Sequence, residues 1–428
     1  MAALAPVAKK LEASGHEVVF LALTTAKQYL DKQKISSIGF RDLLFLADKN
    51  ALEIGEKLAA ELYNVRSSAT QAAHLNGASP RDARPNNAVS YEESVAYLGM
   101  SFSDLIAEKG EAEAEKLYTA QKRQAFLPVR TLRKALEHYK PDVVVSTNSP
   151  RAERAAIMAA GELKIPAVCV VDLFALQERQ WIGASGFADR ICVLNAAVKE
   201  MFLDCGRGED EIVVTGNPAF DVLLTDSART KGQEMQAGRG WNDGKINILF
   251  ASQPEPELHP FNDKIGNPSL PDDIENLLRS FVGNNDGFRL VVRYHPSQNI
   301  VFKEGKNVQF SPTSDEISAV LHACDMVITI TSTVAAQGSI IGKPVITVDK
   351  SIFTEDAPYA EMGISVGVKD LQELTDAILE QSKLLSNASF SKDNKKQDIT
   401  QAVDKVVGVI EGLCHPVDDE VVAQDLVK

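Results

Sequence analysis

A run of hydroxyl side chains follows a short apolar segment in the second half of the sequence. Residues 326–330 are apolar and β-branched, as expected of a buried parallel strand, and residues 331–333 all carry hydroxyl groups. A helical pattern begins next, so the side-chain oxygen of Ser332 or Thr333 is expected to cap the helix. Free N–H groups and the positive end of a helix dipole attract anions, so the pattern predicts a phosphate site.

A second polar segment follows the strand predicted at residues 289–293. Arg293 ends that strand and His295 comes shortly after it, followed by a proline and a serine. Arg293 is expected either to offset phosphate charge or to pair with an acid on a neighbouring helix. His295 is expected to donate to a phosphate or leaving-group oxygen, or else to cap its loop. Ser252 and Gln253 follow the strand predicted at residues 247–251 and are further candidates for phosphate contact.

Length and charge narrow the class of protein. At 428 residues the chain is long enough for two domains, and 44% apolar with 24% charged residues is typical of soluble globular proteins. The net charge of -14 argues against a nucleic-acid partner and against a purely electrostatic hold on anionic membranes. No apolar run reaches the roughly 18 residues that span a bilayer, and no signal peptide is recognisable. We therefore expect a cytoplasmic protein.

Cysteine and histidine usage gives no sign of a metal site or a disulfide framework. The 5 cysteines are scattered without a C-x-x-C pair, and the 7 histidines are equally dispersed. The prediction is a chain without metal or other cofactor, in a reducing compartment.

Strand and helix patterns alternate along almost the whole chain, which predicts an α/β fold with parallel sheets. In the first half, strands are predicted at 17–23, 142–147, 167–172, 190–194 and 211–215, with helices at 51–66 and 91–139. In the second half, strands are predicted at 247–251, 289–293, 307–310, 326–330 and 344–348, with helices near 272–282, 314–323, 333–341 and 370–385. The predicted domains are 1–224, a glycine-rich polar linker at 225–245, 246–396, and 397–428, a helix packing back on the first domain and an acidic tail.

The start of the chain is unusual for a doubly wound domain. Residues 1–16 are typical of the first helix of such a domain, ending at Gly15, so the strand at 17–23 would count as its second strand. The first strand is then missing from the first domain, so either the protein starts upstream of Met1 or the sheet is built differently. Alternatively, Met1 begins an independent surface helix, and 17–23 is the first strand.

Five segments together resemble the GT-B glycosyltransferases, in particular the capsule-polysaccharide type, and the related UDP-N-acetylglucosamine 2-epimerases. They are residues 4–18, 188–195, 213–221, the Tyr294-His295-Pro296 segment, and 331–333 with 342–344. The resemblance implies two Rossmann-like domains facing a cleft, with a nucleotide sugar held by the second domain. Arg293, His295, Ser332 and Thr333 would lie on its phosphates, Gln337 near its ribose, and Gly216 and Asn217 at the cleft floor.

In this fold the base that deprotonates an acceptor would come from strand ends of the first domain. Asp172, after the strand at 167–171, is the first candidate, although it could equally cap a helix. The other candidates for base or acceptor binding are Glu178, Asp142, His74, Ser149, Arg151 and Glu153.

The resemblance implies a metal-independent transfer of sugar from a UDP- or CMP-linked donor to a hydroxyl acceptor in surface polysaccharide or glycoconjugate synthesis, by a protein that can be a homodimer. Two departures keep alternatives open. Gln337 stands where most glycosyltransferases of this fold carry a glutamate, and the epimerase histidine-arginine-glutamate-asparagine signature is missing. The alternatives are an epimerase-like sugar-nucleotide enzyme and a non-catalytic sugar-nucleotide-binding subunit.

Overall fold

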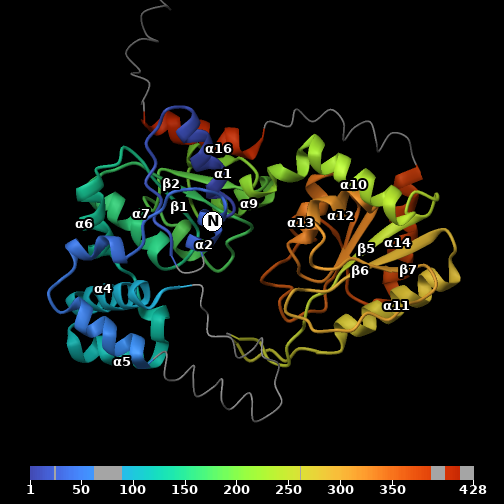
Figure 1. The fold of residues 1–428 in the computed structure, drawn as a ribbon, viewed down its shortest axis with the longest axis horizontal. Coiled ribbons are helices and arrows are strands. Elements are labelled where there is room, and N and C mark those ends of the chain that lie inside the picture. Colours follow the sequence, from blue (N-terminus) through green and yellow to red (C-terminus); the bar gives the residue numbers. More distant parts are fainter. Residues whose placement is uncertain (24–25, 62–88, 261, 387–400, 415–428) are drawn as a thin grey trace, which may run out of the picture. The chain divides into compact units, whose positions relative to one another are not determined.

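Two separate parallel sheets organise the chain, one in each of two units (Figure 1). The structure is a computed structural model that describes residues 1–23, 26–61, 89–260, 262–386 and 401–414. The first unit contains Met1–Ala219 and Gln401–Lys428, and the second contains Phe220–Thr400. Both sheets have only parallel pairings within their named strands, so the predicted α/β fold class is confirmed.

The sheet of the second unit has its strands in the order β10-β9-β8-β5-β6-β7. Their bounds are β5 (Ile246–Ala251), β6 (Phe288–Arg293), β7 (Val308–Phe310), β8 (Met326–Thr329), β9 (Val345–Val348) and β10 (Val366–Val368). The central strands are apolar on both faces because helices cover both sides. The helices are α10 (Asp226–Arg239), α11 (Leu270–Asn284), α12 (Ile317–Ala323), α13 (Val334–Ile340) and α14 (Leu371–Ser386).

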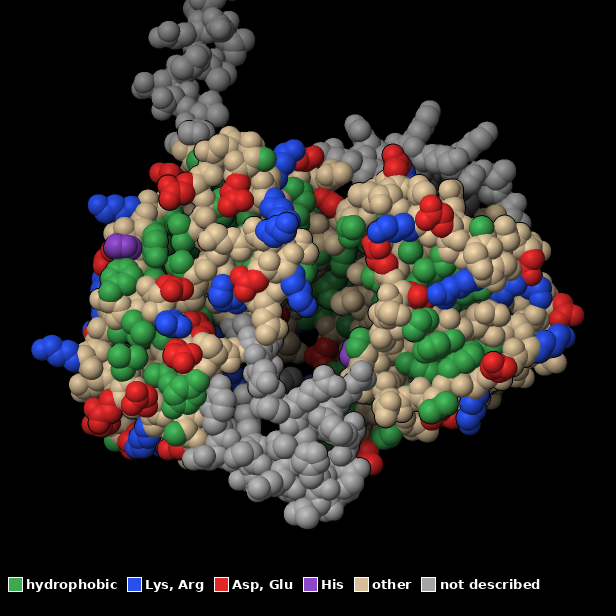
Figure 2. Space-filling view, in the orientation of Figure 1, with side chains coloured by type: hydrophobic (Ala, Val, Ile, Leu, Met, Phe, Trp, Pro, Cys, Tyr) green, Lys and Arg blue, Asp and Glu red, His purple; other side chains and the backbone are tan. Residues whose placement is uncertain are grey.

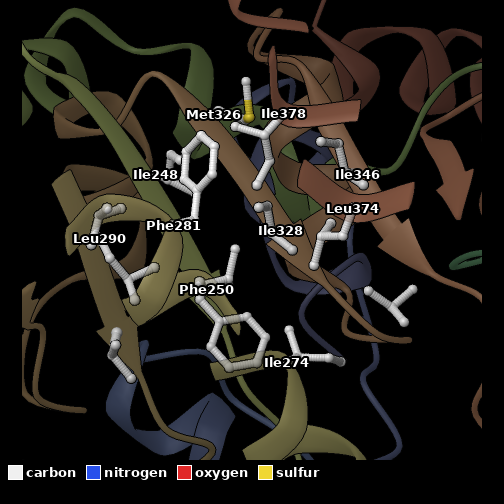
Figure 3. Close-up of a cluster of buried hydrophobic side chains, with 14 of the residues drawn as sticks. Ile248, Phe250, Ile274, Phe281, Leu290, Met326, Ile328, Ile346, Leu374 and Ile378 are labelled. Carbon is white, nitrogen blue, oxygen red and sulfur yellow. The ribbon is translucent and has the colours of Figure 1, made fainter. Parts of the chain in front are cut away.

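The core of the second unit lies between this sheet and the helices α11 and α14. Phe250 and Ile328 on the strands pack with Ile274 and Phe281 of α11 and Leu374 of α14 (Figure 3). These apolar positions recur at helical spacing along α11, which is why that segment forms an amphipathic helix. The opposite face of the sheet is covered by α12 and α13, and α10 packs against α12.

The sheet of the first unit has its described strands in the order β1-β2-β3-β4, so β1 and β4 are its edges. The bounds are β1 (Val144–Thr147), β2 (Ala167–Val170), β3 (Arg190–Val193) and β4 (Ile212–Val214). On one face, α1 (Leu4–Ala13) and α16 (Ala402–Cys414) pack against the sheet and each other. On the other face, α7 (Ala152–Leu163) covers β1 and β2 and packs against α6 (Val129–Tyr139).

A helical layer extends the first unit beyond α6. It consists of a helix at residues 51–61, α4 (Tyr91–Lys109), α5 (Glu111–Gln121) and the short helices η1 (Arg41–Leu46) and η2 (Lys122–Ala125). An aromatic cluster of Phe40, Tyr97, Phe102 and Phe126 forms its centre, with edge-to-face ring contacts. The shorter helices of the unit are α2 (Ala26–Lys32), α8 (Arg179–Ile182), α9 (Ala196–Asp204) and η3 (Glu209–Glu211), and η4 (Pro218–Leu224) crosses the boundary between units.

Two predictions about secondary structure were wrong. The strand predicted at 17–23 forms a single parallel bridge, from Leu21 to Ile38, rather than a ladder. The segment at 225–245, predicted as a linker, contains helix α10, which Thr225 caps by accepting from the Ala228 N–H. The remainder of the predicted helix 51–66 and the acidic tail after residue 416 lie outside the described residues. None of the described helices combines the length and apolarity that crossing a bilayer requires.

Candidate functional site

The carboxyl ends of three neighbouring strands of the second unit lie side by side. Strand β5 pairs with β6 on one edge and with β8 on the other, and Ala251 at its end lies opposite both Arg293 and Thr329. The loops that follow these strands therefore meet at one edge of the sheet. They carry most of the site residues predicted for the second domain: Ser252, Gln253, His295, Ser332 and Thr333.

Gln298 connects the loop after β6 to the loop after β5. Its Oε1 accepts a hydrogen bond from the backbone N–H of His295 at 2.8 Å, and its Nε2 donates to Ser252 Oγ at 3.4 Å. The backbone N–H of Ser252 in turn donates to the carbonyl of Arg293. Gln298 thus fixes the start of the histidine loop relative to the buried serine.

Gln253 connects the loop after β5 to the loop after β8. Its Nε2 donates to Thr331 Oγ1 at 2.5 Å, and its Oε1 accepts from the Thr331 N–H at 3.2 Å. Beneath this pair, Thr329 Oγ1 donates to the carbonyl of Ala251 at 2.7 Å. Both ends of the Gln253 amide are engaged, so in this conformation it positions the residues after β8.

The ring of His295 is held in one tautomer by its own loop. The backbone N–H of Ser297 donates to His295 Nδ1 at 3.2 Å, and the Ser297 hydroxyl lies 2.7 Å from the same nitrogen. A backbone N–H can only donate, so Nδ1 is the acceptor and the proton of the neutral ring is on Nε2. His295 is exposed, so an N–H donor is available to a ligand at the carboxyl edge of the sheet.

The hydroxyl residues after β8 begin helix α13 as the sequence predicts. Ser332 Oγ accepts a hydrogen bond from the Val334 N–H at 3.3 Å, whereas Thr333 occupies the N-cap position without a side-chain cap. The helix has only 7 residues, so an anion at this position would be held by hydroxyl and loop N–H groups more than by a helix dipole. Gln337 lies one turn into α13 and is partly exposed.

Arg293 lies at the same strand end but points its guanidinium at the loop after β7. It donates to Ser311 Oγ at 3.1 Å and to the carbonyls of Pro312 and Asp315 at 2.8 and 3.1 Å. Burial is the main cause that lowers the pKa of Arg293 below its ordinary value. The guanidinium fastens this loop to the sheet, and its contact with phosphate stays a prediction.

A buried glutamate stiffens the loop after β5. Glu255 is 5% exposed and accepts from Ser351 Oγ at 2.6 Å and from the Ile352 N–H at 2.8 Å. The carboxylate is therefore turned toward the loop after β9 and anchors the segment that carries Ser252 and Gln253.

The first unit has its own polar cluster at the carboxyl edge of its sheet. Asp172, just after β2, donates its backbone N–H to Asn148 Oδ1 at 3.3 Å, and its carbonyl accepts from Asn217 Nδ2 at 2.6 Å. Asn217 Oδ1 also accepts from the Ala219 N–H at 2.9 Å, after a turn that Gly216 makes with φ +81°. Asn217 thus fixes the backbone of Asp172, whose side chain is exposed.

Glu178 lies close enough to Asp172 for their charges to interact. Burial raises the pKa of Glu178 above its ordinary value, and the negative charge of Asp172 raises it further. A carboxyl group with a raised pKa exchanges its proton closer to neutral pH, which suits acid–base work. From the sequence, Asp172 is the first candidate for the base and Glu178 a weaker one. In the structure it is Glu178 whose pKa is raised.

The remaining described candidates of the first half lie at the two ends of β1. Asp142 is exposed ahead of the amino end of β1, which is the wrong end for the cluster. Arg151 and Glu153 begin α7 close after β1, together with Ser149. His74 lies outside the described residues.

One connecting residue, Gln298, was missed from the sequence, and Thr331 was noted only as part of the hydroxyl run at residues 331–333. Both residues join the three loops of the second unit. The available signal was position, because both follow predicted strands within the segments that carry the candidates.

In the described part of the chain, no group of three His, Cys, Asp or Glu side chains is arranged to hold a metal ion. Acidic and basic side chains are interspersed on the face of each unit seen in Figure 2.

No protein-family model and no curated protein matches the chain. Among solved structures, a glycosyltransferase from Rickettsia africae ESF-5 is similar at 11% identity and a TM-score of 0.49, with 96% of this chain and 94% of that chain covered. A UDP-GlcNAc 2-epimerase from Neisseria meningitidis bound to UDP-GlcNAc is similar at 16% identity and a TM-score of 0.46, covering 66% and 80%. One from Methanocaldococcus jannaschii, in complex with UDP-GlcNAc and UDP, is similar at 16% identity and a TM-score of 0.43, covering 66% and 80%.

Both kinds of enzyme that the sequence resembles are among these similar structures. One fold serves many activities, so the function of this chain has to be argued from its own site.

Proposed function

We propose that the protein is a glycosyltransferase that binds a nucleotide sugar in its second unit and transfers the sugar to a hydroxyl acceptor. The observation that carries the proposal is the joined set of loops after β5, β6 and β8, with the Nε2–H of His295 available as a donor. The sequence motifs in these loops support the same assignment.

The chemistry of the cluster suits a phosphate ligand. Its hydroxyl, amide and imidazole groups are donors without a formal negative charge, and the nearby Glu255 is turned toward Ser351 and Ile352, from which it accepts hydrogen bonds. Such donors stabilise charge that develops on a leaving phosphate oxygen without a metal ion. His295 would donate to that oxygen, with Ser332 and Thr333 on the phosphates and Gln337 near the ribose.

The first unit would supply the acceptor site and the base. The acceptor oxygen attacks the anomeric carbon, its proton passes to the carboxylate of Asp172 or Glu178, and the bond from sugar to phosphate oxygen breaks. The electron pair of that bond stays on the phosphate that His295 contacts. The raised pKa of Glu178 favours it over Asp172 as the group that takes the proton.

The first experiment measures thermal stability of the protein with UDP, CMP, GDP and TDP and with their sugar conjugates. A ligand at a hundredfold excess over its dissociation constant stabilises the folded state by about 2.7 kcal/mol. We expect one base to raise the melting temperature of the wild type but not of His295→Ala. The matched control is His138→Ala, which changes another exposed histidine, in the first unit. No shift with any nucleotide, or an equal shift in His295→Ala, would contradict the proposal.

Analysis of the products then separates the alternatives. A transferase releases nucleotide from the donor identified above and forms a glycoside when a hydroxyl acceptor is present. Inversion at C2 of the sugar, or release of nucleotide with no acceptor, would instead indicate an epimerase-like enzyme. Binding without turnover for any acceptor would indicate a non-catalytic binding subunit.

A further inference from the structure

The candidate phosphate contacts in the loops after β5, β6 and β8 are hydrogen-bond donors without a positive charge. They form what we call the donor cluster: Ser252, Gln253, His295, Ser332 and Thr333. In its neutral form the histidine contributes an N–H and no charge, because its Nδ1 accepts from the Ser297 N–H. A phosphate at the donor cluster would therefore be bound by neutral groups.

Arg293 ends β6 beside the donor cluster, but its guanidinium is engaged by another loop. Its Nη1 donates to Ser311 Oγ at 3.1 Å and to the Pro312 carbonyl at 2.8 Å. Its Nη2 donates to the carbonyls of Thr313 and Asp315 at 3.4 and 3.1 Å. Each Nη carries two hydrogens, so these bonds use all the Nη donors and leave only the Nε–H. Arg293 therefore holds the loop after β7 and has little capacity left for a phosphate.

The loops that carry and flank the donor cluster are acidic. Those after β5, β6, β8 and β9 contain eight acidic residues against four lysines, in residues 252–269, 294–307, 330–333 and 349–365. The acidic residues are Glu255, Glu257, Asp263, Glu304, Asp349, Glu355, Asp356 and Glu361, and the lysines are Lys264, Lys303, Lys306 and Lys350. Two of the lysines are paired, Lys264 with Glu355 at 2.5 Å and Lys306 with Asp286 at 2.8 Å. The formal charge of these loops is thus negative.

Two of the carboxylates lie where water screens them incompletely. Glu255 is 5% exposed, and Asp349 is half-buried directly after β9, which pairs with β8 in the sheet. The donors to Glu255 are a hydroxyl and a backbone N–H, so its charge is not offset by a cation there. Partly buried charges are screened much less than exposed ones. Each negative charge that a ligand brings to the donor cluster is therefore opposed by these groups.

We propose that the donor cluster selects a sugar donor linked through one phosphate, which carries one negative charge, over a donor linked through a diphosphate, which carries two. This inference rests on the proposed function and names the charge class of the nucleotide sugar. Neutral donors can satisfy the oxygens of a single phosphodiester. A second phosphate adds a charge that neutral donors do not offset and that the nearby carboxylates repel.

The test compares methyl esters of the 5′-monophosphates and 5′-diphosphates of uridine, cytidine, guanosine and thymidine, which carry one and two charges. Affinities are measured by calorimetry on the full chain at pH 8.0 with EDTA. For the base that binds, we expect the monophosphate ester to bind about tenfold more tightly, or about 1.4 kcal/mol. Equal or tighter binding of the diphosphate ester would overturn this inference and leave the proposed function standing. If no ester of any base binds, the proposed function fails as well.

Salt separates a preference set by charge from one set by shape. Added NaCl screens the repulsion between the ligand and the carboxylates, so the preference for the monophosphate ester should shrink about threefold between 50 and 500 mM NaCl. A preference of the same size at both salt concentrations would overturn the inference.

A cation introduced into the donor cluster should weaken the preference. Thr333 is exposed and its side chain makes no cap hydrogen bond, so a substitution there is expected to leave α13 folded. Thr333→Lys should improve binding of the diphosphate ester about fivefold more than binding of the monophosphate ester. Thr333→Gln is the matched neutral control and should keep the ratio of the wild type. The same ratio in both variants would overturn the inference.

Discussion

The two sheets use the same kind of strand but differ in how their strands are flanked. In the second unit, β5 and β8 have a partner on both edges and helices on both faces, and Ile248, Phe250 and Ile328 are 0% exposed. In the first unit, β1 has a partner on one edge only, and Val145 remains half-buried beside a cavity. An apolar parallel strand is stabilised fully only when neighbours complete its ladder and cover both faces.

Within the first unit, the helical layer is packed more closely than the edge of the sheet. Its helical layer contains a close helix crossing in which Gly55 and Gly99 face each other's backbones. A Cβ on Gly99 would lie 1.9 Å from the carbonyl oxygen of Ala51. The helical layer is therefore closely packed, whereas the edge of the sheet at β1 is open.

Gly99→Ala tests that contrast with the largest expected effect. The added methyl forces the two helices apart, so we expect a loss of about 3 kcal/mol in the free energy of unfolding, measured by urea denaturation. Gly161→Ala in α7 is the control, because nothing lies within 4 Å of its Cβ position. The control should be stabilised by about 0.5–1 kcal/mol as a helical Gly-to-Ala change. Equal stability of the two variants would show that the crossing is loose.

A matched pair of valines compares the sheets directly. Val292 in β6 is 0% exposed, so Val292→Ala should cost about 2.5 kcal/mol of unfolding free energy. Val145→Ala removes the same atoms from the half-buried edge of β1 and should cost about 0.5 kcal/mol. Similar losses in denaturation midpoints would mean that the β1 edge is as well packed as the complete sheet.

Gln298→Ala sharpens the comparison of the two polar clusters. The change removes the acceptor of the His295 N–H and the link to Ser252, so the donor loop loses its position. We expect affinity for the nucleotide found in the thermal-shift panel to fall about tenfold, or about 1.4 kcal/mol, by calorimetry. Gln309→Ala, at an exposed position of β7, is the control and should bind normally. Unchanged affinity in Gln298→Ala would show that the hydrogen bonds of Gln298 do not contribute to nucleotide binding.

The smallest expected effect is a pH dependence confined to the second unit. Burial lowers the pKa of His322 below its ordinary value of 6.5, and its Nε2 donates to the Leu223 carbonyl at 2.7 Å. The unfolded chain then takes up the proton more readily, so stability present above pH 6.5 is lost as the pH falls toward the folded-state pKa. The difference between the urea midpoints at pH 7.5 and pH 5.5 should be smaller in His322→Gln than in wild type. If stability depends on pH identically in both proteins, groups other than His322 cause the loss of stability at low pH.

Buried strands of the second unit were predictable because their residues leave little choice. The prediction at 289–293 matches β6 (Phe288–Arg293), and that at 247–251 matches β5 (Ile246–Ala251). Runs of aliphatic residues bounded by polar loops suit a strand covered on both faces. The position of Ser252 and His295 at one sheet edge followed from that order.

Two segments show where pattern alone failed. The alternation at 17–23 is that of a strand, but a ladder also needs a neighbour, and the space next to it is a cavity. The composition of 225–245 is polar and rich in glycine, yet Gly232 in α10 packs closely on His322 of α12. That contact joins residues far apart in the sequence, so no local sequence pattern could predict it.

By itself, the sequence determined the alternation of strands and helices, the parallel sheets and the polar loops that end their strands. These features depend on local periodicity and on which residues avoid water. Only the tertiary structure decided that Gln298 and Gln253 join three loops, that Arg293 turns to the loop after β7, and that β1 borders a cavity. Side-chain direction and unpaired edges depend on which distant segments come together, and sequence spacing does not specify that.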